Sequence, residues 1–311
     1  MVSIDPILQQ ILEAVPFRLS PDDGPAAARK ALRDLPRPPL HPEVRAEDRA
    51  VDSPAGPIPI RIYWPPGHSG PAPVVLFVHG GGFAAGDLET HDGTARQHAV
   101  GADAVVVAVD YRLAPEHPYP AAVDDVWVVL RWIAAHAAEF GGDPRRLAVA
   151  GDSAGGNLAA VLAQLARDAG APQLRFQLLW YPAITWDTSL ASYTENAAAP
   201  ILDLAAITAF SDWYAPDLAR TDPAGLPATL APSRAESLAG LPPAHIAVAG
   251  HDPLRDDGVV YGELLSQAGV AVTVDHAESL IHGYLGYAGF APAATEALDR
   301  GLAALRSALH A

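Results

Sequence analysis

The sequence predicts an α/β protein with a mostly parallel sheet that is covered by helices on both faces. Six short apolar runs carry this prediction, because strands buried on both faces read as nearly continuous hydrophobic stretches. Helical segments separate most of these runs, as the crossovers between parallel strands require. The runs are 74–78, 104–109, 147–150, 176–179, 245–249 and 270–274, and the helical segments are 121–138, 154–169, 256–268 and 292–309.

Two further strands and a helix are expected ahead of this series. Residues 47–52 are strand-like, and residues 58–63 alternate between apolar and other side chains, which is typical of an antiparallel strand near the edge of a sheet. Isoleucines and leucines recur at helical spacing over residues 4–15. We therefore expect an amphipathic helix there, with its apolar face packed on the body of the protein.

One long segment interrupts the alternation of strands and helices. Residues 183–230 separate two core strands, hold no obvious strand, and are rich in aromatic residues and prolines. An insertion of this length in a compact fold is usually functional. We expect residues 1–45 and 183–230 to form a helical cap over a core of residues 46–182 and 231–311. Trp213 and Tyr214 are candidates for a substrate pocket, although these aromatics fit the interior of the cap equally well.

The composition excludes several classes of function. The 311 residues include 20 basic and 36 acidic side chains, and the net charge of −16 argues against nucleic acid or an anionic membrane surface as a partner. Cysteine is absent, which excludes disulfides, thiolate metal sites and a thiol nucleophile. No apolar run reaches the roughly 20 residues that span a bilayer, and no basic, apolar leader is apparent. We therefore expect a cytoplasmic protein without stable membrane insertion.

The run Gly151-Asp152-Ser153-Ala154-Gly155-Gly156 lies directly between an expected strand and an expected helix. A nucleophile elbow needs this order, and it needs glycines around the serine because side chains there would collide in the sharp turn. The turn lifts the serine hydroxyl out of the sheet, at the positive end of the helix dipole. Ser153 is therefore the candidate nucleophile. The alternative is a serine that only caps the helix.

A second motif, His79-Gly80-Gly81-Gly82-Phe83, follows directly after the run 74–78. Three consecutive glycines cost conformational entropy, but they allow backbone N–H groups to face a ligand closely. Acyl transfer needs such donors where the oxyanion of the tetrahedral intermediate forms. The alternatives are a flexible turn or a phosphate-binding loop, but the G-x-G-x-x-G spacing of dinucleotide-binding loops is not present here.

Together the two motifs resemble the hormone-sensitive-lipase family (bacterial family IV) of α/β-hydrolase carboxylesterases. The resemblance continues in the right order from about residue 45 to the end, through residues 110–116, 120–125, 240–244, 252–258 and 282–284. It implies the α/β-hydrolase fold, with an eight-stranded, mostly parallel sheet, helices on both faces and a helical cap. It also implies Gly81 and Gly82 as oxyanion-hole donors, next to the N–H of Ala154, the residue after the nucleophile.

In this fold the base follows the acid and the nucleophile along the chain, so only late histidines qualify. His282 is expected on a loop beyond the last strand, where it can reach the elbow, and it matches the base of the family motif. His276 is the alternative, but a histidine at the end of a strand is more often an ordinary half-buried residue. The late histidines are His251, His276, His282 and His310.

The acid that orients the base is expected to be Asp252. It follows the run 245–249, and active sites of open α/β sheets assemble at the carboxyl ends of the strands. The family pattern also places the acid there. Asp256 and Asp257 come where a helix begins, so helix capping explains them.

These residues predict a serine carboxylesterase for short- to medium-chain acyl esters, with no metal and no organic cofactor. Two alternatives remain open: an amidase or deacetylase of the arylacetamide type with the same triad, and a non-catalytic small-molecule receptor on the same fold. The expected partner is a small-molecule ester, and the last strand could pair with a second copy in a homodimer.

Overall fold

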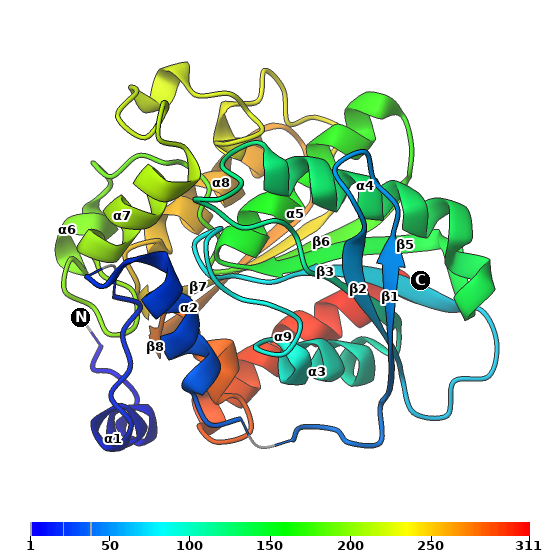
Figure 1. The fold of residues 1–311 in the computed structure, drawn as a ribbon, viewed down its shortest axis with the longest axis horizontal. Coiled ribbons are helices and arrows are strands. Elements are labelled where there is room, and N and C mark those ends of the chain that lie inside the picture. The colour runs from blue at the N-terminus through cyan, green and yellow to red at the C-terminus, as the bar shows by residue number, and fades with distance from the viewer. Residues whose placement is uncertain (1, 21, 38) are drawn as a thin grey trace.

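The computed structural model describes residues 2–20, 22–37 and 39–311. Within them, eight strands form one sheet in the order β1-β2-β4-β3-β5-β6-β7-β8 (Figure 1). Strand β2 runs antiparallel to both of its neighbours, and every pairing from β4 onward is parallel. The strands are β1 Arg45–Val51, β2 Ile58–Trp64, β3 Ala72–Val78, β4 Val105–Val109, β5 Gly142–Asp152, β6 Leu174–Trp180, β7 Ala244–His251 and β8 Val272–Ile281.

Helices cover both faces of the sheet. Helices α4, α5 and α8 lie on one face, and α3 and α9 lie on the other (Figure 1). The helices are α1 Pro6–Ala14, α2 Gly24–Asp34, α3 Asp92–Ala102, α4 Ala121–His136, α5 Ala154–Ala169, α6 Ala191–Glu195, α7 Leu204–Tyr214, α8 Arg255–Gln267 and α9 Pro292–Leu309, with 3₁₀ turns η1 Ala137–Phe140, η2 Pro223–Gly225, η3 Pro232–Arg234 and η4 Tyr284–Tyr287.

The central strands explain why the apolar runs are continuous. In β3, Val74, Leu76 and Val78 pack into the core with α4 and α5, whereas Val75 and Phe77 pack into the core with α3 and α9. Successive side chains of a strand point to opposite faces, so a strand between two helical layers needs apolar residues at every position. The mostly parallel α/β sheet predicted from these runs is confirmed.

Two predictions about the elements were wrong. No helix was predicted between residues 78 and 104, but α3 lies there; its buried side is made of small and polar residues such as Ala95, His98 and Ala99, which give no strong apolar stripe. The last strand was predicted at 270–274, but it continues to Ile281. It is an edge strand, so one side of it is half exposed and carries polar residues such as His276.

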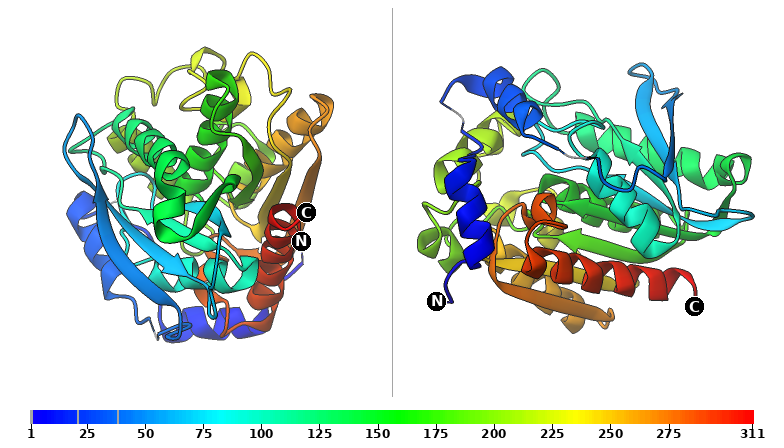
Figure 2. Two further views of the ribbon diagram at one scale, coloured as in Figure 1. Left: turned by 90° about the vertical axis from the view of Figure 1, so that its right-hand side faces the viewer. Right: turned by 90° about the horizontal axis from the view of Figure 1, so that it is seen from below.

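The N-terminal helices and the segment 183–230 gather at one end of the molecule, near the carboxyl ends of the central strands (Figure 2). The two segments touch through an isolated parallel bridge between Arg18 and Ile201, and the Leu19 N–H donates to the Ile201 carbonyl at 2.8 Å. In α1, Leu8 is fully buried, while Ile7 is 42% exposed. Within the described residues, no helix is both long enough and apolar enough to cross a membrane.

Candidate active site

Ser153 occupies the sharp turn between β5 and α5. Its φ of 56° and ψ of −118° lie outside the regions that L-residues ordinarily adopt. The neighbouring glycines are required by close backbone approach: a Cβ on Gly151 would lie 2.3 Å from the Gly155 carbonyl oxygen, and one on Gly155 would lie 2.0 Å from the Val78 carbonyl oxygen. The Ser153 N–H donates to the Trp180 carbonyl at 2.8 Å, which anchors the turn to β6.

Three side chains from distant parts of the sequence touch in series at this turn. His282 Nε2 lies 3.0 Å from Ser153 Oγ, and His282 Nδ1 lies 2.8 Å from Asp252 Oδ2. A carboxylate can only accept hydrogen bonds, so Nδ1 donates and Nε2 is left to accept the serine proton. Asp252 is fully buried, and its Oδ1 accepts a second hydrogen bond from the Leu254 N–H at 2.8 Å.

Gly81, Gly82 and Ala154 line the space around Ser153. Gly81 and Gly82 have φ values of +119° and +60°, and Ala154 is the first residue of α5, where an N–H has no partner within the helix. Among the described residues, none accepts a hydrogen bond from the N–H of Gly81, Gly82 or Ala154. A Cβ on Gly81 would lie 2.2 Å from the Ala85 carbonyl oxygen, so this tight turn requires glycine.

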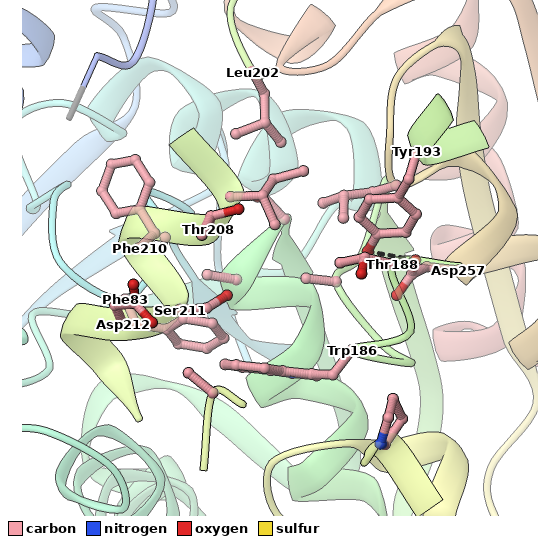
Figure 3. A pocket seen from close by; sticks show the side chains of 18 of the residues that line it. Phe83, Trp186, Thr188, Tyr193, Leu202, Thr208, Phe210, Ser211, Asp212 and Asp257 are labelled. Atoms are coloured by element: carbon pink, nitrogen blue, oxygen red, sulfur yellow. Dashed lines mark hydrogen bonds between the residues drawn. The ribbon is translucent and has the colours of Figure 1, made fainter. Parts of the chain in front are cut away.

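Two hollows meet at Ser153. The first, of about 350 Å³, also contains Gly82 and Ala154 and is walled by α7 and the segment 183–193 (Figure 3). The second, of about 360 Å³, contains His282 and Gly81 and is walled by α1, α2 and residues 283–290. Each hollow has the size of a small-molecule site, and the hydroxyl of Ser153 stands between them.

The comparisons with known proteins agree with this architecture. Residues 75–286 match a family described as having the alpha/beta hydrolase fold. The chain belongs to the α/β-hydrolase family. The esterase LipI of Mycobacterium tuberculosis is 65% identical over 310 residues, which cover 99% of this chain and 96% of that protein. The carboxylesterase NlhH of the same species is 57% identical over 310 residues, covering 99% and 97%. The crystal structure of DphMB1 is 64% identical, with a TM-score of 0.94 and coverage of 99% and 100%.

Within this family the chain is a carboxylic ester hydrolase, and its motifs agree with the hormone-sensitive-lipase group that they resemble.

The loop that carries the three glycines is held by hydrogen bonds and ring stacking from its neighbours. Asp152 accepts the Gly80 N–H at 2.9 Å, and His79 stacks on Tyr111, whose hydroxyl donates to the His79 carbonyl. These contacts give His79 and Asp152 structural roles in holding the loop.

Burial and neighbouring groups shift the pKa values of two side chains near the elbow, His79 and Asp152. Burial lowers the pKa of His79 to about 4, so this histidine is neutral at pH 7. Burial opposes ionisation of Asp152, yet the nearby His91 together with the Gly80 N–H holds the pKa of this carboxyl below its usual value. Among residues 2–20, 22–37 and 39–311, no three histidine or acidic side chains are grouped closely enough to hold a metal ion.

The structure separates the competing candidates for base and acid. His276 lies within β8, pairs with Val248, and is half exposed, so it does not approach Ser153 as His282 does. Helix capping does not explain Asp256 and Asp257, contrary to expectation, because their carboxylates bind segment 184–193 instead. Asp257 accepts hydrogen bonds from the N–H groups of residues 184 and 185 and from the Tyr193 hydroxyl, and Asp256 accepts from the N–H of residue 192.

Neither Trp213 nor Tyr214, the two aromatic candidates for a substrate pocket, lines either hollow, which agrees with the alternative that they belong to the interior of the cap. Tyr214 is fully buried and stacks face to face on Phe83 at 3.8 Å, and Trp213 packs against Phe210. The aromatic residues that line the first hollow are Phe83, Trp186, Tyr193 and Phe210 (Figure 3). Phe210 and Trp186 could not be singled out from the sequence, because every aromatic in the insertion looks alike without the orientation of the helix. Phe210 and Trp213 are three residues apart on α7, so both belong to one apolar stripe of the helix, and the pattern does not show which of them faces the hollow.

Proposed function

We propose that this ester hydrolase works through Ser153 as nucleophile, His282 as general base and acid, and Asp252 as the carboxylate that orients the histidine. The observation that carries the proposal is the unbroken series of contacts from Ser153 Oγ through His282 to Asp252, at 3.0 and 2.8 Å. Such a series activates a weak nucleophile because the base can accept its proton while the acid stabilises the resulting imidazolium.

The reaction follows in two halves. Ser153 Oγ attacks the ester carbonyl while its proton passes to His282 Nε2, and the carbonyl oxygen becomes an oxyanion. The N–H groups of Gly81, Gly82 and Ala154 donate to this oxyanion; each such donor typically lowers the barrier by about 3 kcal/mol. Collapse of the intermediate expels the alkoxide, which takes the proton from His282. Water then repeats the sequence on the acyl-enzyme, releases the carboxylic acid and restores Ser153.

The proton transfer assigns the two hollows. The leaving alcohol must take its proton from His282 Nε2, and His282 lines only the second hollow. The alcohol portion therefore occupies the second hollow, and the acyl portion extends into the first, past Phe210. A bounded acyl hollow of about 350 Å³ supports short- to medium-chain acyl esters of small molecules as substrates.

The remaining expectations belong to the same proposal. Residues 1–45 and 183–230 form the cap over the core of 46–182 and 231–311; the bridge between Arg18 and Ile201 supports this division. Strand β8 is a sheet edge of ten residues, which supports pairing with a second copy in a homodimer. The net charge of −16 supports small molecules rather than nucleic acid as partners. Cytoplasmic location is proposed with them; cell fractionation tests it, and gel filtration tests the dimer.

Hydrolysis of a panel of p-nitrophenyl esters from acetate to laurate, next to p-nitroacetanilide, tests the proposal. We expect the highest kcat/KM on the shorter esters, little turnover of the anilide, and no turnover by Ser153→Ala, with circular dichroism of the variant unchanged. Full activity of Ser153→Ala would refute the nucleophile. A higher kcat/KM on the anilide than on the matched acetate would identify an amidase of the arylacetamide type instead.

A further inference from the structure

Helix α2 reaches the glycine loop through one side chain. The guanidinium of Arg29 donates from Nε to the Ala84 carbonyl at 2.7 Å and from Nη2 to the Ala114 carbonyl at 2.7 Å. Its outer edge pairs with Glu116 through Nη1 at 2.9 Å and Nη2 at 2.5 Å. The Arg29 side chain is only 19% exposed, so these hydrogen bonds are partly shielded from water.

The loop that Arg29 contacts is under backbone strain. Gly81, Gly82 and Phe83 have consecutive positive φ values of +119°, +60° and +60°, and Phe83 is not a glycine. A non-glycine residue in this conformation costs about 1–3 kcal/mol and persists only where the surrounding structure holds it. This backbone conformation sets the direction of the Gly81 and Gly82 N–H groups, which the proposed function assigns to the oxyanion.

The hydrogen bonds of Arg29 hold the two residues that flank or bind the strained Phe83. The Ala114 N–H donates to the Phe83 carbonyl at 2.9 Å, and Arg29 binds the carbonyl of Ala114 and that of Ala84, the next residue after Phe83. Only a planar fork with several donors can reach both carbonyls and a carboxylate together; a lysine ammonium is a point charge on a flexible stem. This set of hydrogen bonds therefore requires arginine at position 29.

We propose that Arg29 is a positioning residue for the oxyanion hole, which makes the N-terminal segment part of the catalytic apparatus as well as a wall of the second hollow. The inference rests on the proposed function, because it assigns the glycine N–H groups to the oxyanion. Arg29 touches no reacting atom; it acts by holding the loop 81–85 in the conformation that presents these donors. Loss of the side chain lets the loop relax away from the geometry that the transition state needs.

The test compares Arg29→Met and Arg29→Lys with Lys30→Met, which changes the next residue of the same helix and removes only an exposed pair with Asp34. Two measurements are needed: kcat and KM on p-nitrophenyl butyrate, and the inhibition constant of an alkyl trifluoromethyl ketone, whose adduct with a serine carries an oxyanion. We expect Arg29→Met to lower kcat about tenfold while KM stays within about twofold of the wild type. The inhibition constant of the ketone should rise by the same factor of about ten.

Arg29→Lys should fall between the wild type and Arg29→Met, and Lys30→Met should match the wild type in both measurements. Three results would overturn the inference: kcat of Arg29→Met within about twofold of the wild type, a rise in KM with kcat unchanged, or a fall in kcat without any loss of ketone affinity. If Arg29→Met lowers the thermal midpoint but leaves kcat unchanged, Arg29 has a merely structural role, and the inference is overturned. Failure of the proposed function is distinct, because Ser153→Ala would then keep its activity.

Discussion

Asp252→Asn separates the charge of the triad from its shape. Asp252 Oδ1 accepts the Leu254 N–H at 2.8 Å, and Oδ2 accepts from His282 Nδ1 at 2.8 Å. In the variant, the amide oxygen must stay on the Leu254 side, because a buried N–H left facing an NH₂ costs about 1–3 kcal/mol. The NH₂ then faces His282 and donates to Nδ1. His282 is thereby held as the tautomer with its proton on Nε2, which cannot accept the proton of Ser153.

The magnitude follows from these two effects. A preference of 1–3 kcal/mol leaves roughly one molecule in 5 to 150 in the productive orientation, and that fraction also lacks the charge that stabilises the imidazolium. The same Asp→Asn change in a serine-protease triad lowers kcat about 10⁴-fold, so we expect a fall of that size here, or about 5.5 kcal/mol in the barrier, with the lost charge supplying the part that orientation does not. Initial rates on p-nitrophenyl butyrate measure this fall, and an unchanged circular dichroism spectrum shows that the variant is folded.

Asp275→Asn is the matched control for this experiment. It makes the same chemical change in β8, seven residues before His282, at a carboxylate that pairs with Arg300 on the surface. We expect its kcat within about twofold of the wild type. Retention of more than a tenth of wild-type kcat by Asp252→Asn would refute the reasoning, because another group would then have to orient His282.

Three further predictions test the elbow, the buried carboxylate and the acyl hollow. Ser153→Gly and Ser153→Ala should both be inactive, but the glycine variant should be more stable by about 1 kcal/mol in denaturant unfolding, because only glycine accepts the φ of 56° without strain; equal stabilities would contradict strain at the elbow. Burial raises the pKa of Asp257 to about 6, so its ionisation makes the wild type lose stability as the pH rises from about 4 through 6. Asp257→Asn keeps a hydrogen-bond acceptor but cannot ionise. Between about pH 4 and 6 the free energy of unfolding of the wild type should therefore fall relative to that of the variant. Parallel pH curves would show that Asp257 is not the group responsible. Phe210→Ala should raise kcat/KM for the octanoate relative to the butyrate by about tenfold, whereas Trp213→Ala on the same helix should leave this ratio unchanged; the reverse outcome would place Trp213 in the acyl hollow.

The accuracy of the sequence predictions depended on how local each signal was. The strand–turn–helix at Ser153 was predictable because glycines around a serine, between an apolar run and a helical run, satisfy one local geometric demand. The helix α9 was predicted at 292–309 with the bounds that the structure shows, because its apolar stripe is regular. Helix α3 was missed because it buries small and polar residues, which leave the periodicity weak.

The long-range contacts around the site were harder to predict than its motifs. Asp256 and Asp257 were assigned to helix capping because the start of a helix is the only role that neighbouring residues reveal. Their actual partners lie in segment 184–193, more than 60 residues earlier in the chain, and no local pattern encodes such a contact. The same limit applies to Arg29, whose carbonyl partners Ala84 and Ala114 are 55 and 85 residues away.

The sequence by itself determined the layers of the sheet, the turn at Ser153 and the chemical identity of the groups that could act there, because each depends on apolar periodicity or on backbone conformation within a few residues. The tertiary structure decided between His282, which lies 3.0 Å from the hydroxyl, and the alternative His276, and it alone decided which aromatic rings face the hollow and which arginine contacts the glycine loop. Those outcomes depend on how elements far apart in the chain pack across the sheet, and packing is a property of all the surfaces in contact rather than of any one segment.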